Sequence, residues 1–119
     1  MPIEPLSTSS GPITLPEPVA AYFRAEQEKN AEAVSQCFTA DAPVTDEGHT
    51  YHGVSEIQAW IAESFSKFDF TNQPFAVEEK EGTIVVTSHV EGNFPGSPID
   101  LKFIFQLSGD KIAVLEVTP

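Results

Sequence analysis

Positive charge is scarce in this sequence, which has six Lys and Arg residues against 18 Asp and Glu and a formal net charge of −12. Nucleic-acid-binding proteins neutralise phosphates with a basic surface, and anionic membranes attract basic segments. The composition therefore argues against nucleic acids and membrane surfaces as partners. The excess of negative charge favours solubility and repels anionic ligands, but it does not determine the fold.

Cysteine and long apolar runs are scarce as well. Cys37 is the only cysteine, so an intrachain disulfide and a four-thiolate zinc site are both excluded. The first residues have neither a basic start nor an apolar run, and no stretch approaches the ~18 apolar residues that a membrane span requires. We therefore expect a cytoplasmic protein without a signal peptide.

Apolar residues are plentiful by contrast, at 40% of the chain with nine Phe among them. A chain of 119 residues is close to the usual size of one domain, so we expect a single hydrophobic core. Residues 1–14 are rich in Pro, Ser and Gly and lack periodicity, which predicts a flexible arm. The predicted domain covers residues 15–119.

Helical spacing dominates the first half of that domain. A first helix is predicted to begin around Pro16 and to end near Lys29, and Asn30 is a suitable cap for a second, short helix. Ser55 and Gln58 have the spacing of a capping box for a third helix. The apolar residues behind that box share one helix face: Ile57, Trp60, Ile61, Phe65 and Phe68.

The second half of the domain alternates with a period of two, which is typical of strands. Predicted strands contain Phe75 and Val77, residues 84–90, residues 101–107 and residues 112–117, and the predicted turns are Glu81-Gly82 and Ser108-Gly109-Asp110. A brief extended segment at 41–45 and a polar loop at 46–53 precede the third helix. Strands that follow one another through short turns form antiparallel sheets, so the predicted class is α+β.

The order of these elements resembles the nuclear transport factor 2-like superfamily, which includes the ketosteroid isomerases and the SnoaL-like polyketide cyclases. Three groups of residues carry the resemblance: Tyr22-Phe23 with Phe38 to Asp46; Asp46-Glu47-Gly48 with Tyr51-His52-Gly53, Ile57 and Trp60; and Ser97 to Asp100 with Ser108 to Ile112. The resemblance implies a cone-shaped, cystatin-like roll. In it, three helices pack in the concave face of a strongly curved antiparallel or mixed sheet, around a pocket for a small apolar molecule.

The same resemblance implies a chemistry that needs no cofactor. Aligned without gaps, Asp46 corresponds to the isomerase base and Tyr22 to the tyrosine that donates a hydrogen bond to the enolate oxygen. Asp100 would be the second acid. Its strand parity differs from that of Phe103 and Phe105, however, so on a regular strand Asp100 faces the other side of the sheet. The alternatives are an ordinary turn residue at Asp46, a core tyrosine at Tyr22 and an edge residue at Asp100.

Five further side chains are candidates for ligand contacts: Phe23, Trp60, His89, Phe103 and Phe105. His89 could point into the cone, or it could be an interior histidine with a satisfied hydrogen bond. Asp46, His49 and His52 lie close in sequence, but their spacing is not that of a zinc site, and we predict no metal. Cys37 lies on an apolar helix face, where a thiol behaves as a small hydrophobe.

Three functions are compatible with these patterns. The first is an isomerase or cyclase that transfers a proton beside the carbonyl group of an apolar substrate. The second is a module that binds a small ligand without converting it. The third is an assembly role, with a homodimer formed through the sheet by Val85, Thr87 or the odd-numbered Phe residues.

Overall fold

The structure is a computed structural model that describes residues 13–119; residues 1–12, most of the predicted arm, lie outside the described part. The described chain folds into these elements: α1 (Glu17–Gln27), α2 (Ala31–Ser35), β1 (Pro43–Asp46), β2 (His49–His52), α3 (Gly53–Lys67), β3 (Phe70–Lys80), β4 (Thr83–Gly92), β5 (Ile99–Ser108) and β6 (Lys111–Thr118). None of these helices is long and apolar enough to cross a membrane.

The strands form one six-stranded sheet in the order β2-β1-β6-β5-β4-β3. All neighbouring strands are antiparallel except β1 and β6, which run parallel, so the sheet is mixed. In that parallel pair Asp46, the last residue of β1, lies opposite Val117. The pairing therefore places the end of β1 beside the C-terminal part of β6.

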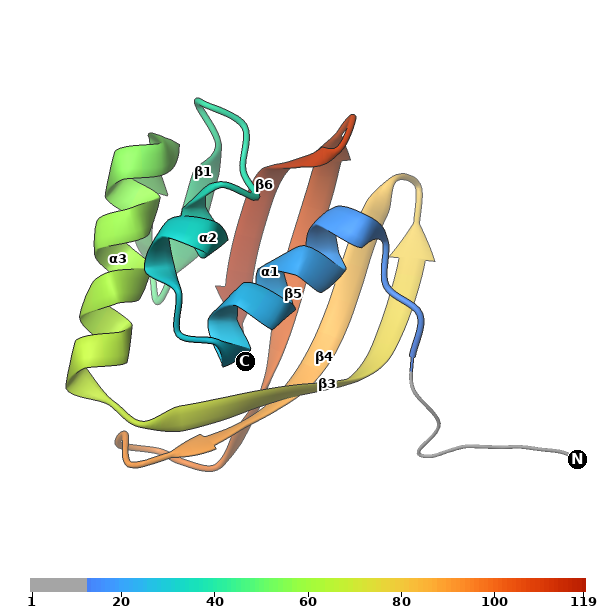
Figure 1. Cartoon of the computed structure of the whole chain (residues 1–119). Coiled ribbons are helices and arrows are strands. Elements are labelled where there is room, and N and C mark those ends of the chain that lie inside the picture. Colours follow the sequence, from blue (N-terminus) through green and yellow to red (C-terminus); the bar gives the residue numbers. More distant parts are fainter. Residues whose placement is uncertain (1–12) are drawn as a thin grey trace, which may run out of the picture.

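The three helices lie on the same side of the curved sheet (Figure 1). Helix α1 packs against α2 and extends over the sheet, and α3 packs against α2 and β2. Between the layers lies one core, whose largest fully buried apolar residues are Tyr22, Phe105, Ile57, Ile61, Ile112, Leu115, Val19, Val34, Val44 and Val86. Full burial of one aliphatic or aromatic side chain stabilises a fold by ~1.5–3 kcal/mol. The predicted α+β cone, with its helices in the concave face, is confirmed.

Two helix starts show how local chemistry sets the boundaries. The cap of α2 is as predicted, because Oδ1 of Asn30 accepts a hydrogen bond from the backbone N–H of Ala33 at 3.0 Å. The predicted capping box of α3 is wrong: the helix already begins at Gly53, with His52 in the N-cap position. Instead, the carboxylate of Glu56 accepts a hydrogen bond of 2.8 Å from the backbone N–H of His52, the N-cap residue, so this backbone donor has a partner.

Two strands differ from the sequence-based expectation. The predicted polar loop at 46–53 contains β2, which forms a tight hairpin with β1. Strand β3 begins at Phe70, five residues before the expected Phe75. The predicted turn at Glu81-Gly82 is confirmed, and both residues have the positive φ that a type I′ hairpin turn requires.

A β-bulge between Pro74 and Ala76 changes which residues of β3 face the core. Before the bulge, Asn72 pairs with Val90 and is buried; after it, Val77 pairs with Val86. Phe75, at the bulge, is 53% exposed. The period-two pattern did not predict this exposure, because a bulge inserts one residue and shifts the alternation.

Candidate active site

A cavity of about 740 Å³ opens between α1, α3, the end of β1 and the concave face of the sheet. Aromatic rings form much of its wall: Tyr22, Trp60, Phe68, Phe70, Phe94 and Phe103. Carboxylates also line it, at Glu26, Asp46, Glu47 and Glu116. No Lys, Arg or His is among the lining residues in the described part of the chain. The cavity therefore combines apolar walls with acidic groups.

Asp46 reaches this cavity from the last position of β1. Nε1 of Trp60, on α3, donates a hydrogen bond of 3.1 Å to its Oδ2. The indole is itself held by the ring of Tyr51, which stacks on it at a centroid distance of 5.8 Å. Partial burial raises the pKa of Asp46, and the Trp60 hydrogen bond opposes that rise. The carboxylate of Asp46 is therefore fixed in position by a hydrogen bond and is partly desolvated. Both properties suit a general base.

Tyr22, on α1, is more deeply buried than Asp46 and has no exposed surface. Its ring packs edge-on against Phe23 and Phe105, at centroid distances of 5.1 and 5.7 Å. Its hydroxyl donates a hydrogen bond of 3.2 Å to Oε2 of Glu26. Burial, reinforced by the charge of Glu26, raises the pKa of Tyr22 well above 10, so the phenol remains protonated at neutral pH.

Glu26, one helical turn after Tyr22, is a site residue that the sequence-based interpretation missed. It is only 5% exposed, and its Oε1 accepts a hydrogen bond from Nδ2 of Asn72. Oγ of Ser88 in turn donates to Oδ1 of Asn72. Burial raises the pKa of Glu26 to about 7, against the opposing hydrogen bonds from Asn72 and Tyr22. Tyr22, Glu26, Asn72 and Ser88 thus form a continuous buried network, here called the Glu26 network.

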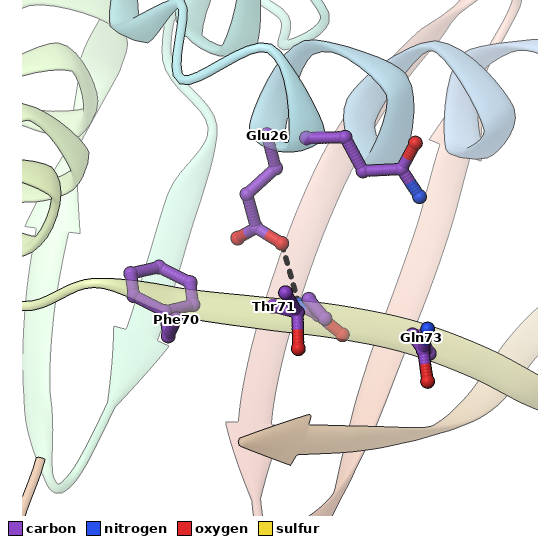
Figure 2. A pocket seen from close by; sticks show the side chains of 6 residues that line it. Glu26, Phe70, Thr71 and Gln73 are labelled. Carbon is purple, nitrogen blue, oxygen red and sulfur yellow. Dashed lines mark hydrogen bonds between the residues drawn. The ribbon is translucent and has the colours of Figure 1, made fainter. Parts of the chain in front are cut away.

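A smaller cavity of about 340 Å³, here called the α1–β3 groove, lies on the other side of Glu26. It is lined by Glu26, Gln27 and residues 70–73. Figure 2 shows Glu26 reaching from α1 to β3, with a dashed line marking its hydrogen bond to Asn72. Glu26, Phe70 and Asn72 border both cavities, so they form the partition between them.

The aromatic candidates fall into two groups. Trp60 and Phe103 line the larger cavity. Phe23 and Phe105 are buried, at 3% and 0% exposure, but belong to the core that supports Tyr22. Because Phe103 and Phe105 are buried and face inward, these two odd-numbered Phe residues are not available for a contact on the outer face of the sheet, which corrects that part of the expectation.

Asp100 and His89 lie away from the cavity. They pair across β4 and β5, and Nδ1 of His89 is 2.8 Å from Oδ1 of Asp100 on the exposed side of the sheet. This hydrogen bond raises the pKa of His89. The expectation that His89 points into the cone is wrong, because its odd position on β4 faces away from Val86 and Ser88. No bulge brings Asp100 inward, so the strand parity noted in the sequence holds.

The histidines near Asp46 do not gather around it. His49 and His52 are both exposed on β2. Within residues 13–119, no three His, Cys, Asp or Glu side chains cluster in a way that could hold a metal ion. Cys37 is half-buried, its Sγ donates to the carbonyl oxygen of Ala33 at 3.4 Å, and burial raises its thiol pKa, which makes it a poor nucleophile.

The chain belongs to the family of SnoaL-like domains, because residues 19–115 match that family's sequence profile. No curated protein matches the chain significantly. The predicted resemblance to the nuclear transport factor 2-like superfamily is thereby confirmed for nearly the whole described domain.

Solved structures agree with this family. A protein from Sinorhizobium meliloti that is assigned as a polyketide cyclase shares 33% identity, with a TM-score of 0.84 over 87% of this chain and 95% of that one. A protein of ketosteroid isomerase-like fold from Catenulispora acidiphila, solved with trimethylamine, shares 20% identity, with a TM-score of 0.79 over 89% and 87% of the two chains.

A third solved structure is that of SalBIII, an epoxide hydrolase/cyclase-like enzyme of pyran ring formation in salinomycin. It shares 21% identity, with a TM-score of 0.74 over 86% of this chain and 87% of that one. At identities near 20%, such likenesses establish the fold and leave the chemistry to be argued from the site.

Proposed function

We propose that the larger cavity binds a small apolar carbonyl compound and that Asp46 transfers a proton beside its carbonyl group, with Tyr22 as hydrogen-bond donor to the oxygen. The product would be an isomer or a ring-closed form of the substrate. The observation that carries this proposal is that Asp46 and Tyr22 both line one cavity, and that the carboxylate of one and the hydroxyl of the other are each held by a hydrogen bond.

The reaction needs only these groups and the substrate. Asp46 removes a proton from the carbon next to the carbonyl, and the electrons of the broken C–H bond form the enolate. The enolate oxygen gains negative charge, which a preorganised donor stabilises strongly in a site that excludes water. Protonated Asp46 then returns its proton to another carbon of the conjugated system. Alternatively, the enolate carbon attacks a second carbonyl group and closes a ring, and the resulting alkoxide oxygen takes the proton from Asp46.

Two properties of the cavity support an apolar substrate. Six aromatic rings line it, and an apolar lining with few polar groups is typical of small-molecule sites. The described lining contains no cation that would pair with a phosphate or a carboxylate. The assigned polyketide cyclase among the similar structures is consistent with ring closure as one of the two outcomes.

Exchange of hydrogen for deuterium tests this proposal without knowledge of the substrate. A panel of cyclic ketones and enones is incubated with the protein in deuterated water, and loss of the proton next to the carbonyl is followed by NMR. We expect accelerated exchange for part of the panel and a decrease of 10²–10⁴-fold in Asp46→Asn, the usual contribution of a general base.

Glu47→Gln is the matched control, because Glu47 is the exposed neighbour of Asp46 at the cavity mouth and should be dispensable for exchange. Exchange by Asp46→Asn at the wild-type rate would contradict the assignment of the base. Ligand binding without exchange by any of these proteins would instead favour the second candidate, a module that holds its ligand unchanged.

We further propose a homodimer through the outer face of the sheet. No described helix covers that face in Figure 1, and it carries Val85 and Thr87, which are only half-buried. Sedimentation of wild-type protein and of Val85→Asp tests this proposal. A dimer that dissociates in the variant would support it, and a monomeric wild-type protein would contradict it.

A further inference from the structure

The hydroxyl of Tyr22 has one hydrogen, and in the structure that hydrogen is directed at Glu26. The two side chains lie on consecutive turns of α1, and the Oη–Oε2 distance is 3.2 Å. A hydroxyl whose hydrogen is donated to a carboxylate has only lone pairs left for any other partner. A ligand carbonyl or enolate oxygen in the cavity needs a donor, so the bond to Glu26 competes directly with the proposed role of Tyr22.

The protonation state of Glu26 decides the outcome of this competition. An ionised carboxylate only accepts hydrogen bonds, whereas a protonated carboxyl group also donates one. When Glu26 is protonated, its hydrogen can be donated to the Tyr22 oxygen, and the hydrogen of Tyr22 becomes free to turn toward the cavity. We infer that protonation of Glu26 switches Tyr22 from a partner of Glu26 into a hydrogen-bond donor for the ligand oxygen.

The rest of the Glu26 network fixes where that proton resides. Ser88 donates to Oδ1 of Asn72, which leaves the NH₂ group of Asn72 directed at Oε1 of Glu26. Because Oε1 faces a donor, it must act as an acceptor in both protonation states. The exchangeable proton therefore belongs on Oε2, the oxygen beside Tyr22.

Every charged or titratable group that acts on Glu26 is compatible with a switch near neutral pH. Burial raises the pKa of Glu26 to about 7, and the charge of Asp46 contributes in the same direction. The charge of Lys29, whose ammonium lies over the ring of Phe70 at 4.7 Å, favours the ionised form. Tyr22 does not titrate in this range, because its own pKa is raised well above 10.

The α1–β3 groove supplies the route by which Glu26 reaches equilibrium with solvent. Glu26 lines this groove, shown in Figure 2, as well as the larger cavity, so a ligand that fills the cavity leaves the groove side of the carboxyl group open. Glu26 is thus a positioning residue that acts through Tyr22. The inference rests on the proposed function, because it assumes that a carbonyl oxygen binds beside Tyr22.

The test uses a neutral ketone, so that any dependence on pH belongs to the protein. 2-Acetonaphthone labelled with ¹³C at the carbonyl is titrated at pH 5.5 and pH 8.5, and both its Kd and its infrared C=O stretching frequency are measured. Wild-type protein should lower the stretching frequency of the bound ketone at pH 5.5, and much less at pH 8.5. The Kd should increase roughly three- to tenfold across this interval, the value of one hydrogen bond.

Three variants separate the switch from a structural role. Gln at position 26 mimics protonated Glu26, since its amide can donate to Tyr22 while its oxygen accepts from Asn72. Glu26→Gln should therefore keep the low stretching frequency at both pH values. Tyr22→Phe should show a high stretching frequency at both pH values. Asp46→Asn should still show a stretching frequency that rises with pH, with its midpoint at a lower pH than in wild type, because the charge of Asp46 favours the protonated form of Glu26.

The outcomes distinguish this inference from the proposed function. A bound ketone whose stretching frequency does not change with pH in wild-type protein overturns the switch and leaves the cavity as a carbonyl site. The same conclusion follows if Glu26→Gln retains the wild-type pH dependence. Failure of wild-type protein to bind any ketone of the panel overturns the proposed function itself. The wild-type titration decides the question even without the variants.

Discussion

At the scale of single residues, the position of Glu26 carries a clear energetic cost. Glutamate is almost never fully buried unless it is paired, and Glu26 pairs with neutral donors rather than with a cation. The folded protein therefore holds the proton of Glu26 more tightly than the unfolded chain does, with a pKa of about 7 against 4.5. Linkage turns this difference into a dependence of stability on pH.

The first prediction concerns that dependence. Between pH 4.5 and 7 the folded state binds more protons at Glu26 than the unfolded state, so the free energy of unfolding should fall as pH rises. The loss should reach at most about 3 kcal/mol, at 1.4 kcal/mol per unit of pKa. Urea unfolding at pH 5 and pH 8 measures it. In Glu26→Gln the free energy of unfolding should fall less between the two pH values, by the contribution of Glu26. Glu28 is a nearby exposed acid, so in Glu28→Gln this fall should equal that of wild type.

Trp60 gives a second prediction at this scale. Its indole N–H stabilises the ionised form of Asp46, so Trp60→Phe should raise the pKa of Asp46 further. An NMR titration of the Asp46 carboxyl carbon measures the change. Ile61→Val serves as a control, because it removes a buried methyl group from the same helix without altering a hydrogen bond to Asp46. An unchanged Asp46 titration in Trp60→Phe would contradict the assigned contact.

The sequence predicted some site residues and missed others for identifiable reasons. Asp46, Tyr22, Trp60 and Phe103 were predicted, and all four border the cavity. Glu26 was assigned only to a helix, although its spacing of four from Tyr22 places both on one face. A polar residue at an inward position of a strand, such as Ser88 between Val86 and Val90, is a signal that could have revealed the buried network.

At the scale of elements, the junction where β3 begins beside the end of β4 depends on Gly92. A Cβ atom at this position would overlap the carbonyl oxygen of Asp69 and lie 2.6 Å from Cβ of Phe70. Both contacts involve backbone or the root of a side chain, which cannot move without shifting the strand. Phe70 lines both cavities, so the close approach of Gly92 to the start of β3 helps to position the site.

Gly92→Ala should therefore destabilise the fold by about 1–3 kcal/mol, the usual cost of overpacking. Thermal unfolding monitored by circular dichroism measures the change, and Glu91→Ala, at the exposed neighbouring position, serves as the control. We also expect weaker ketone binding by Gly92→Ala, because the start of β3 must shift. A melting temperature equal to that of wild type would show that the backbone around Gly92 and Asp69 has room for a methyl group, which would contradict this prediction.

Element boundaries were harder to predict than element types. All three helices and the long strands were expected, because their apolar residues repeat over ten or more positions or follow a recognised cap. The four-residue strand β2 was missed, because its side chains are mostly exposed and produce no alternation. Its strand structure comes from pairing with β1, a tertiary effect that no local pattern records.

At the scale of the whole molecule, negative charge should select the ligand. The net charge of −12 combines with four acidic residues in the cavity lining, two of which, Glu47 and Glu116, are exposed. An anion entering the cavity is repelled at long range and gains no ion pair with a lining residue. A cation, by contrast, can approach both carboxylates and the faces of aromatic rings.

The fourth prediction uses three ligands of one shape: 2-naphthoate, 2-naphthalenemethanol and 2-naphthylmethylammonium. Calorimetry at pH 7.5 should show that the anion binds at least about tenfold more weakly than the alcohol and that the cation binds no more weakly than the alcohol. Added salt should narrow the difference, because exposed charges are screened. The double variant Glu47→Gln, Glu116→Gln should also reduce the difference in affinity between the anion and the alcohol. Equal affinities for anion and alcohol would contradict this prediction.

The placement of β6 has a consequence for synthesis of the chain on the ribosome. The strand lies between β1 and β5, so it joins the hairpin of β1 and β2 to the three strands β3 to β5. Until Lys111–Thr118 has emerged, the nascent polypeptide can form at most two separate pieces of sheet, because each piece pairs with the other only through β6. The cavity that contains Asp46 is lined in part by residues 116–119, so a protein whose translation stops before residue 111 would lack both the complete core and this cavity.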